Sequence, residues 1–347
     1  MNYRVIVASG LVALAFGCVT APQYVTGKYE GTAAKVAPKH VILVGWDGFA
    51  GNTVEPAKIP TLRKLMAEGA WTVHSRSILP SASACCWHSI FTCSASEQHG
   101  YIAWNSQKPA FPAAAVADNG LYPDIMYMLR RQKPSSEIGF IYDWGGMGFV
   151  ADTNACSYVE RMPQSNITDR AVAYIKEKKP TFFTVYYDSP DDKGHGKGWG
   201  SPEYQARVTE LDAELSRILD AVKETGILED TVVMVTSDHG GLNKGHGGPT
   251  LSEMERPVVL WGKDVKRGHE LAFPGTNYDT GATLAALLGL EPPSCWIGRP
   301  FDEAFDADRD EVLSSLPSKG VSLVINPASN MVSAAKSIAL AEKYDYI

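Results

Sequence analysis

The chain has 347 residues, 45% of them hydrophobic, and a formal net charge of -7 at pH 7. This length and composition allow a large buried core, and they exceed one average domain without requiring two. The acidic balance provides no basic footprint for nucleic acid, so a nucleic-acid partner is not expected.

The N-terminus is typical of an export signal. A short basic start at Asn2-Tyr3-Arg4 precedes an apolar stretch over residues 5–16 that is too short to span a bilayer. Residues 15–18 resemble a bacterial lipoprotein box, although Leu14 lies one position further from Cys18 than is usual. We predict a signal peptide over residues 1–18 with lipid attachment at Cys18, and an ordinary cleaved signal is the alternative.

Residues 19–38 are rich in Ala, Thr, Gly and Lys, and we expect them to form the flexible tether that a lipid anchor requires. Residues 39–347 are expected to form one catalytic domain. The protein is then expected to be exported by a bacterium, either into the periplasm or onto a membrane as a lipoprotein.

Three apolar runs typical of buried strands each lead to an acidic residue. Residues 41–46 precede Asp47, residues 182–187 precede a turn with Asp191 and His195, and residues 232–235 precede Asp238 and His239. Because open α/β sheets place their chemistry at the carboxyl ends of strands, we expect one shared site. The mixture of oxygen and nitrogen ligands suits zinc best, whereas each Asp alone is more typical of a turn or a helix cap.

A candidate nucleophile lies between the first and second of these runs. Ser81 and Ser83 precede an apolar, helix-compatible segment that extends to Thr92. A hydroxyl at a helix start lies against free backbone N–H groups and the positive end of the helix dipole, which favour an anionic ester and a developing alkoxide. The alternative is that these serines only cap the helix.

The remaining pattern predicts alternating strands and helices. Residues 137–142 and 257–261 are expected to be buried strands. The clearest helix spans residues 202–225, with one apolar stripe and Gly226 as its stop, and residues 171–179 and 330–344 also suit helices. This alternation predicts an α/β fold with a mainly parallel central sheet and helices on both faces.

The chain resembles the alkaline phosphatase superfamily, in particular its type I phosphodiesterase and nucleotide pyrophosphatase branch, over most of its length after residue 39. In that family the nucleophile lies nine residues before a Thr and sixteen before a His-Gly pair. Counting back from Thr92 and from His99 leads both times to Ser83, which the resemblance therefore favours over Ser81. The other site residues follow the family's order, which is Asp47, Asp191 with His195, and Asp238 with His239.

The resemblance implies an alkaline-phosphatase-like fold and two metal ions at one site. The expected metal is zinc, with another divalent metal as the alternative. By resemblance, one ion would be held by the Ser83 oxygen together with Asp47, Asp238 and His239.

The second ion would be held, by resemblance, by Asp191, His195 and a third ligand. The candidates for that ligand are His246 and His269. We prefer His246 because phosphate mutases of the superfamily place their last His shortly after the Asp-His pair. Its glycine-rich setting also lets the backbone approach an ion closely.

Asn105 is expected to bind substrate, because it resembles the phosphate-contacting Asn that pyrophosphatases carry, displaced here by one residue. A turn residue is the alternative. Many relatives carry an Asn three residues after the nucleophile, where this chain has Cys86. Sulfatases of the superfamily carry an Arg four positions beyond their nucleophile, and the residue there is Trp87, which argues against a sulfatase.

The expected function is hydrolysis of small-molecule phosphate diesters or monoesters through a phosphoseryl intermediate at a two-zinc site. A nucleotide or aryl phosphodiesterase ranks above a general monoesterase, since Trp46, Trp87 and Trp104 are available to stack on a base or aryl group. The alternatives are a sulfatase or phosphonate hydrolase of the same superfamily, and a surface binding protein that has lost turnover. Cys85 is an alternative nucleophile, and the pairing of the five cysteines after Cys18 stays open.

Overall fold

A computed structural model describes residues 24–306 of the chain. Its eight strands are β1 His40–Trp46, β2 Ala70–Arg76, β3 Ile138–Tyr142, β4 Tyr158–Arg161, β5 Phe182–Tyr187, β6 Thr231–Thr236, β7 Glu255–Gly262 and β8 His269–Glu270. Its α-helices are α1 Thr32–Val36, α2 Pro60–Glu68, α3 Ser83–Thr92, α4 Ser96–His99, α5 Ile125–Gln132, α6 Met147–Val150, α7 Gln164–Lys178, α8 Asp191–Lys197, α9 Pro202–Glu224, α10 Leu251–Met254 and α11 Asn277–Leu287. The predicted signal peptide with Cys18 and the helix predicted at residues 330–344 lie outside the described residues.

All eight strands belong to one sheet with the order β4-β3-β5-β1-β6-β7-β2-β8. The five strands from β4 to β6 are parallel, whereas β7 is antiparallel to both of its neighbours. Parallel neighbours need crossover connections, which here contain the helices that cover the sheet. The predicted α/β fold with a mainly parallel sheet is therefore confirmed, and the strand predicted at residues 257–261 is an antiparallel one.

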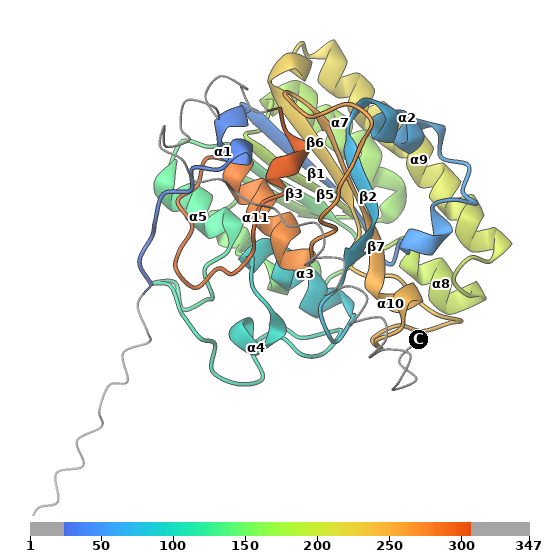
Figure 1. Cartoon of the computed structure of the whole chain (residues 1–347), viewed down its shortest axis with the longest axis horizontal. Helices are drawn as coiled ribbons and strands as arrows, with labels where there is room; N and C mark the ends of the chain where they lie inside the picture. Colours follow the sequence, from blue (N-terminus) through green and yellow to red (C-terminus); the bar gives the residue numbers. More distant parts are fainter. Residues whose placement is uncertain (1–23, 307–347) are drawn as a thin grey trace, which may run out of the picture. The chain divides into compact units, whose positions relative to one another are not determined.

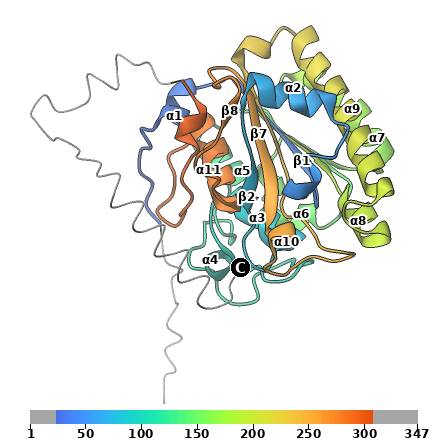
Figure 2. The same ribbon diagram turned by 45° about the vertical axis from the view of Figure 1, so that its right-hand side comes forward.

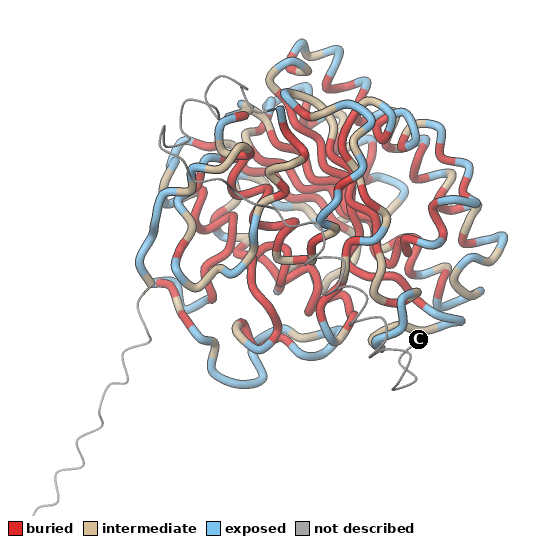
Figure 3. Tube along the Cα trace, viewed as in Figure 1, coloured by how far each residue is buried: buried red, intermediate tan, exposed pale blue. Residues whose placement is uncertain are grey.

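Helices cover both faces of the sheet (Figures 1 and 2). One face carries α1, α3, α5 and α11, and the other carries α2, α7 and α9. Alternate residues of β1 serve the two faces, because Val41 and Leu43 belong to one buried hydrophobic cluster and Ile42 and Val44 to the other. The strands at the centre are buried along their whole length, as Figure 3 shows.

The strand register sets the position of the acidic residues. β1 lies between β5 and β6, and its last residue pairs with the last residue of β5. The last residue of β6 pairs with the residue before the end of β1. Asp47 and Asp188 therefore directly follow adjacent strands, and Asp238 follows the third strand two residues later. The strand register therefore brings three carboxylates to one edge of the sheet.

The helix predicted over residues 202–225 is confirmed as α9, which starts at Pro202 after a Ser201 cap and is followed by Gly226 at a φ of +70°. α7 begins seven residues before the start predicted at residue 171, because Ile167 and Thr168 extend its buried face. The turn predicted at Asp191 is a helix, α8.

The structure differs from the expected flexible tether over residues 24–38. This segment contains α1, and its Ala33 and Val36 side chains are buried in the core. The Ala33 backbone N–H donates to Asp302 at 2.8 Å, and the Tyr29 hydroxyl donates to the same carboxylate. Apolar side chains in a polar-looking stretch therefore fix it to the domain, and residues 19–23 lie outside the described part. Within residues 24–306, no helix has the length and apolar character needed to cross a membrane.

Candidate metal centre and active site

The first group of ligand atoms comes from the ends of β1 and β6. The Nε2 atom of His239 lies 3.2 Å from Asp238 Oδ2 and 3.6 Å from Asp47 Oδ1. All three side chains are fully buried, and their ligand atoms lie within 4.8 Å of one another. The structure thus brings together the three protein side chains that were predicted to share a metal ion with Ser83.

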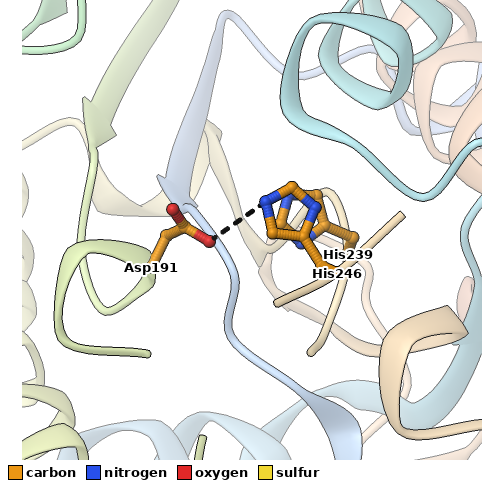
Figure 4. A group of neighbouring side chains, drawn as sticks. All are labelled: Asp191, His239 and His246. Atoms are coloured by element: carbon orange, nitrogen blue, oxygen red, sulfur yellow. Dashed lines mark ion pairs between the residues drawn. The ribbon is translucent and has the colours of Figure 1, made fainter. Parts of the chain in front are cut away.

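The second group of ligand atoms surrounds Asp191 at the start of α8. His195 Nε2 lies 3.3 Å from Asp191 Oδ2, and His246 Nε2 lies 3.7 Å from Asp191 Oδ1. Asp191 and His195 are one helical turn apart, which places them on the same side of α8. His246 comes from the loop after β6 and stacks on His239 with ring centroids 3.8 Å apart, so the two groups adjoin (Figure 4).

The three histidines of these groups are oriented alike. Each places Nδ1 within hydrogen-bond distance of a backbone carbonyl, at 2.7 Å for His239, 3.0 Å for His195 and 2.8 Å for His246. A carbonyl only accepts, so Nδ1 carries the proton and Nε2 keeps its lone pair. That lone pair faces the carboxylates in every case, which is the arrangement of a metal-ligating imidazole fixed by an outer hydrogen bond.

The carboxylates have oxygen atoms that no protein group satisfies. Within the described residues, one buried oxygen of each lacks a hydrogen-bond donor, namely Asp47 Oδ1, Asp191 Oδ1 and Asp238 Oδ2. Buried polar atoms are normally hydrogen-bonded, and an unsatisfied one calls for an explanation such as an ion. Oxygen and imidazole donors at this density fit divalent cations such as zinc.

Burial is the main cause of the shifted pKa values in the two ligand groups. It raises the pKa of Asp238 to about 6, and together with neighbouring carboxylates it holds the pKa values of Asp47 and Asp191 well above the ordinary range. Burial also lowers the pKa of His239 and of His246 to about 3. The imidazoles of His239 and His246 are therefore neutral at physiological pH, as metal ligands must be, and a divalent cation would offset the repulsion among the carboxylates.

Ser83 is the hydroxyl at this centre. It is the first residue of α3 and is buried, and its Oγ lies 3.2 Å from His239 Nε2. Ser81 is engaged elsewhere, since its hydroxyl donates to the Gly248 carbonyl at 2.8 Å and accepts from the Gly247 N–H at 3.1 Å. Ser81 thus anchors the loop that carries His246, whereas Ser83 faces the ligand cluster.

Two aromatic side chains donate hydrogen bonds to Asp47, and neither contact was predicted from the sequence. Trp87 donates its indole N–H to Asp47 Oδ2 at 2.9 Å, and the Tyr186 hydroxyl donates to the same oxygen at 2.5 Å. Both aromatic residues are fully buried. These bonds direct Oδ1, the other oxygen, at His239. Trp87 and Trp46 therefore pack in the interior, and the prediction that they form aromatic walls is wrong.

A second buried network positions the segment that carries Asp238. Asn277 accepts from the Ile78 N–H at 2.7 Å and donates to the Asp238 carbonyl at 2.9 Å. The Arg256 guanidinium, also fully buried, donates to the Ser237 carbonyl at 2.8 Å. A buried Arg within a strand run shows no special sequence signal, so neither residue was predicted.

A pocket of about 610 Å³ opens beside the centre. It is lined by Ser83, the second ligand group and residues that sequence reasoning left unassigned; the lining residues are Pro80, Ala82, Ser83, Ile102, Ala103, Trp104, Trp144, Asp188, Asp191, Asp192, His195, Gly245, His246 and Gly247. Asp188 directly follows β5 as Asp47 follows β1, and the same strand-end rule would have found it. Trp104 is 58% exposed and is available as an aromatic wall.

Two predicted or alternative site residues, Asn105 and His269, lie elsewhere, and so does the buried His88. Asn105 is exposed in the turn beside Trp104 and does not line the pocket. Trp104 lines this part of the pocket instead. His269 lies in β8 and pairs with Glu303 at 3.4 Å, so of the two candidate third ligands only His246 lies beside Asp191. His88 is buried in α3 and donates through Nδ1 to the Val150 carbonyl, which is a packing role.

The described cysteines are free thiols: Cys85, Cys86, Cys93, Cys156 and Cys295. Burial raises the pKa of Cys85 to about 12, so its thiolate is scarcely populated at neutral pH. Cys86, which stands where many relatives carry an Asn, is fully buried with its thiol 3.7 Å from the Pro80 carbonyl.

Proteins of known identity match this chain in sequence. Bis(5′-adenosyl)-triphosphatase from Homo sapiens is 24% identical over 241 residues, which are 62% of this chain and 50% of the relative. Ectonucleotide pyrophosphatase/phosphodiesterase family member 7 from Rattus norvegicus is 23% identical over 248 residues, covering 66% of this chain and 55% of the relative. The chain thus spans about half the length of the curated relatives that it matches.

The fold matches solved structures as well. Human ectonucleotide pyrophosphatase/phosphodiesterase 5 superposes with a TM-score of 0.63 at 14% identity, covering 77% of this chain and all of that one. A likeness at this identity supports the fold alone. The sequence profile of the type I phosphodiesterase and nucleotide pyrophosphatase family matches residues 41–124 and 146–320, which is more than half of the chain. With strand ends, ligand order and fold in agreement, the chain belongs to the type I phosphodiesterase/nucleotide pyrophosphatase family.

Proposed function

We propose that this protein is an exported, metal-dependent phosphohydrolase that cleaves small-molecule phosphate diesters, and monoesters less readily, through a phosphoseryl intermediate on Ser83. The observation that carries the proposal is the Ser83 hydroxyl 3.2 Å from His239, in a centre of two adjoining ligand groups whose buried carboxylate oxygens lack donors. The printed names of the relatives support a phosphoric ester or anhydride as substrate.

The two ligand groups would hold two zinc ions. Asp47, Asp238 and His239 would hold one of them beside Ser83, and Asp191, His195 and His246 would hold the other. Bound there, divalent cations would stabilise an ionised serine oxygen and the negative charge that develops on the departing oxygen.

Ser83 performs the first displacement. Its oxygen forms a bond to phosphorus while the bond from phosphorus to the departing alcohol breaks, and the alcohol leaves with a proton taken up from water. The start of α3 favours the phosphoryl charge, because backbone N–H groups and the positive end of the helix dipole lie there. A water oxygen then forms a bond to phosphorus while the bond from phosphorus to the Ser83 oxygen breaks. The serine oxygen takes up the proton that the water gives up, and the phosphate monoester is released.

The proposal is tested with three proteins and three substrates. Zinc content and turnover of bis(p-nitrophenyl) phosphate, p-nitrophenyl phosphate and p-nitrophenyl sulfate are measured for the wild type, Ser83→Ala and Ser81→Ala. We expect two zinc ions in the wild type and in Ser83→Ala, and diester turnover in the wild type with a loss of at least about a thousandfold in Ser83→Ala. Ser81→Ala should lose far less turnover, because its hydroxyl only anchors the loop that carries His246.

Two outcomes of this experiment would redirect the proposal. Sulfate turnover above diester turnover would support a sulfatase. Bound zinc without turnover of any ester would support a binding protein.

Export and lipidation at Cys18 are part of the same proposal. They rest on the basic start and the apolar stretch of residues 5–16. Incorporation of labelled palmitate into the wild type and its absence in Cys18→Ser would support them, whereas an unlabelled wild type released into the periplasm would favour an ordinary signal peptide.

A further inference from the structure

A second pocket, of about 300 Å³, lies on the face of the sheet that α1 and α11 cover (Figure 2). α11 begins near the ligand groups, because the Asn277 side chain in its first turn donates to the Asp238 carbonyl at 2.9 Å. The second pocket lies further along this helix, beside Ala282, Ala285 and Ala286. None of the described residues that line it belongs to the two ligand groups. It is therefore a separate site that the proposed hydrolysis does not use.

The second pocket is lined by small and apolar residues. The three alanines of α11 form its floor, and none of the described lining residues carries a charge. The polar side chains of the lining already have hydrogen-bond partners; these pairs are Thr26 with Glu291, Tyr29 with Asp302, Ser294 with the Val25 N–H, and Trp296 with the Pro123 carbonyl. A ligand of this pocket therefore needs neither a charge nor a hydrogen-bonding group, and a hydrocarbon chain meets that requirement.

One wall of the second pocket is the first described segment of the chain. Val25, Thr26 and Gly27 line the pocket, and the apolar Val25 is 72% exposed. This segment pairs with another segment of the lining, because the Gly27 N–H donates to the Pro292 carbonyl at 3.1 Å and the Ser294 N–H donates to the Val25 carbonyl at 2.7 Å. The chain therefore enters the domain at the rim of this pocket.

The proposed lipid attachment site is close to this wall along the chain. Cys18 precedes Val25 by seven residues, which span about 25 Å at most. An acyl chain attached at Cys18 is therefore held near the second pocket at an effective concentration on the order of millimolar. In addition, each methylene group that leaves water for the pocket favours the docked state about fourfold.

We infer that the second pocket holds a fatty acyl chain of the lipid on Cys18 while the protein is in water. The attached chain is favoured over a free fatty acid, because a free acid would bring a carboxylate to a lining that has no cationic side chain. A bilayer competes for the same chain, so the docked state is that of protein away from a membrane. The inference rests on the proposed lipidation of Cys18.

The test is photo-cross-linking of the full chain. Bacteria that produce the protein are fed a palmitate analogue with a diazirine on its hydrocarbon chain. The labelled protein is purified in detergent, diluted below the critical micelle concentration, irradiated and digested. We expect mass spectrometry to find most of the cross-links within residues 25–29 and 282–300, which contain the lining of the second pocket. A mixture of isotope-labelled and unlabelled protein shows whether a cross-link joins a chain to itself, which is the expected result.

Two variants fill the second pocket, and a third is their matched control. Ala285→Phe adds a ring from the floor of the pocket, and Ser294→Phe adds one from its exposed rim. Each ring displaces two or more methylene groups, so we expect at least about a tenfold loss of the pocket cross-links. Ala206→Phe adds the same ring at an exposed position of α9, on the opposite face of the sheet, and should keep the wild-type pattern. Circular dichroism of each variant checks that it is folded.

Three outcomes would overturn the inference. Labelled protein whose cross-links lie outside the second pocket, or only between two chains, would do so and leave the lipidation intact. Pocket cross-links that persist in both Ala285→Phe and Ser294→Phe would also overturn it. Protein without label would overturn the lipidation of Cys18 and the inference together. None of these results bears on hydrolysis at Ser83, which the diester assay tests separately.

Discussion

Asp238→Asn should stabilise the metal-free protein although it removes a metal ligand. Asp238 is fully buried beside His239, and burial raises its pKa from 3.8 to about 6. A carboxyl whose folded pKa is raised destabilises the folded state most when it is ionised, that is, above about pH 6. At about 1.4 kcal/mol for each pH unit, the difference corresponds to about 3 kcal/mol at pH 7.5.

The stabilisation by Asp238→Asn should depend on pH. The destabilisation disappears as the pH falls through the window from about 6 to 3.8, because the folded protein then takes up the proton that the unfolded chain binds less tightly. The stabilisation by Asp238→Asn should therefore fall to about half of this size at pH 5. The neutral buried imidazole of His239 is present in both proteins, and burial is the main cause of its lowered pKa, so its opposing pH dependence cancels in the comparison.

The assay is urea unfolding of EDTA-treated wild type and Asp238→Asn at pH 7.5 and pH 5. A matched control is Asp212→Asn, since this buried carboxylate accepts from the Thr61 and Leu62 N–H groups at 2.9 and 2.7 Å and caps α2. We expect the control to destabilise the protein by about 1 kcal/mol. If Asp238→Asn destabilised the metal-free protein at pH 7.5, or stabilised it equally at both pH values, the reasoning about buried ligands would be refuted.

Four further predictions concern the site and its support. His246→Ala should lose one bound zinc and most diester turnover, whereas His269→Ala should keep both, as metal analysis and kinetics on the two proteins will show. Asn277→Ala leaves a buried N–H and a buried carbonyl without partners, so we expect a loss of about 2–4 kcal/mol in urea unfolding, and a loss below about 0.5 kcal/mol would contradict this. Gly281→Ala would place a Cβ 1.8 Å from a carbonyl oxygen of α3 and should destabilise by about 3 kcal/mol or more in the same assay. Gly196→Ala, in α8 with open space around the added methyl, should be neutral or stabilising by up to about 1 kcal/mol.

The sequence predicted the centre of the fold well because the signals there are local. Apolar runs that end at Asp47 and Asp238 indicate buried strands, and parallel strands must present their carboxyl ends at one edge. The helix that begins at Ser83 was predictable from its apolar run, and its register beside His239 follows from the fold. Metal ligands that follow adjacent parallel strands can therefore be predicted from one sequence.

The rest of the site depends on contacts between distant segments, which local patterns do not contain. Trp87 was expected at the substrate, yet its indole N–H satisfies Asp47, forty residues earlier in the chain. Trp144 lines the pocket, and its backbone N–H donates to Asp143, which also accepts from the backbone N–H directly after β5. Residues 24–38 lack a helix or strand signal because their composition is that of a tether, and two buried side chains suffice to dock them.

The most direct test of the central claim is a crystal structure of the zinc-loaded protein with anomalous diffraction data collected at the zinc absorption edge. We predict two anomalous peaks at the carboxyl edge of the sheet, one among Asp47, Asp238 and His239 beside Ser83, and one among Asp191, His195 and His246. A single peak, or peaks outside these two groups of side chains, would contradict the two-metal centre on which the proposed hydrolysis depends.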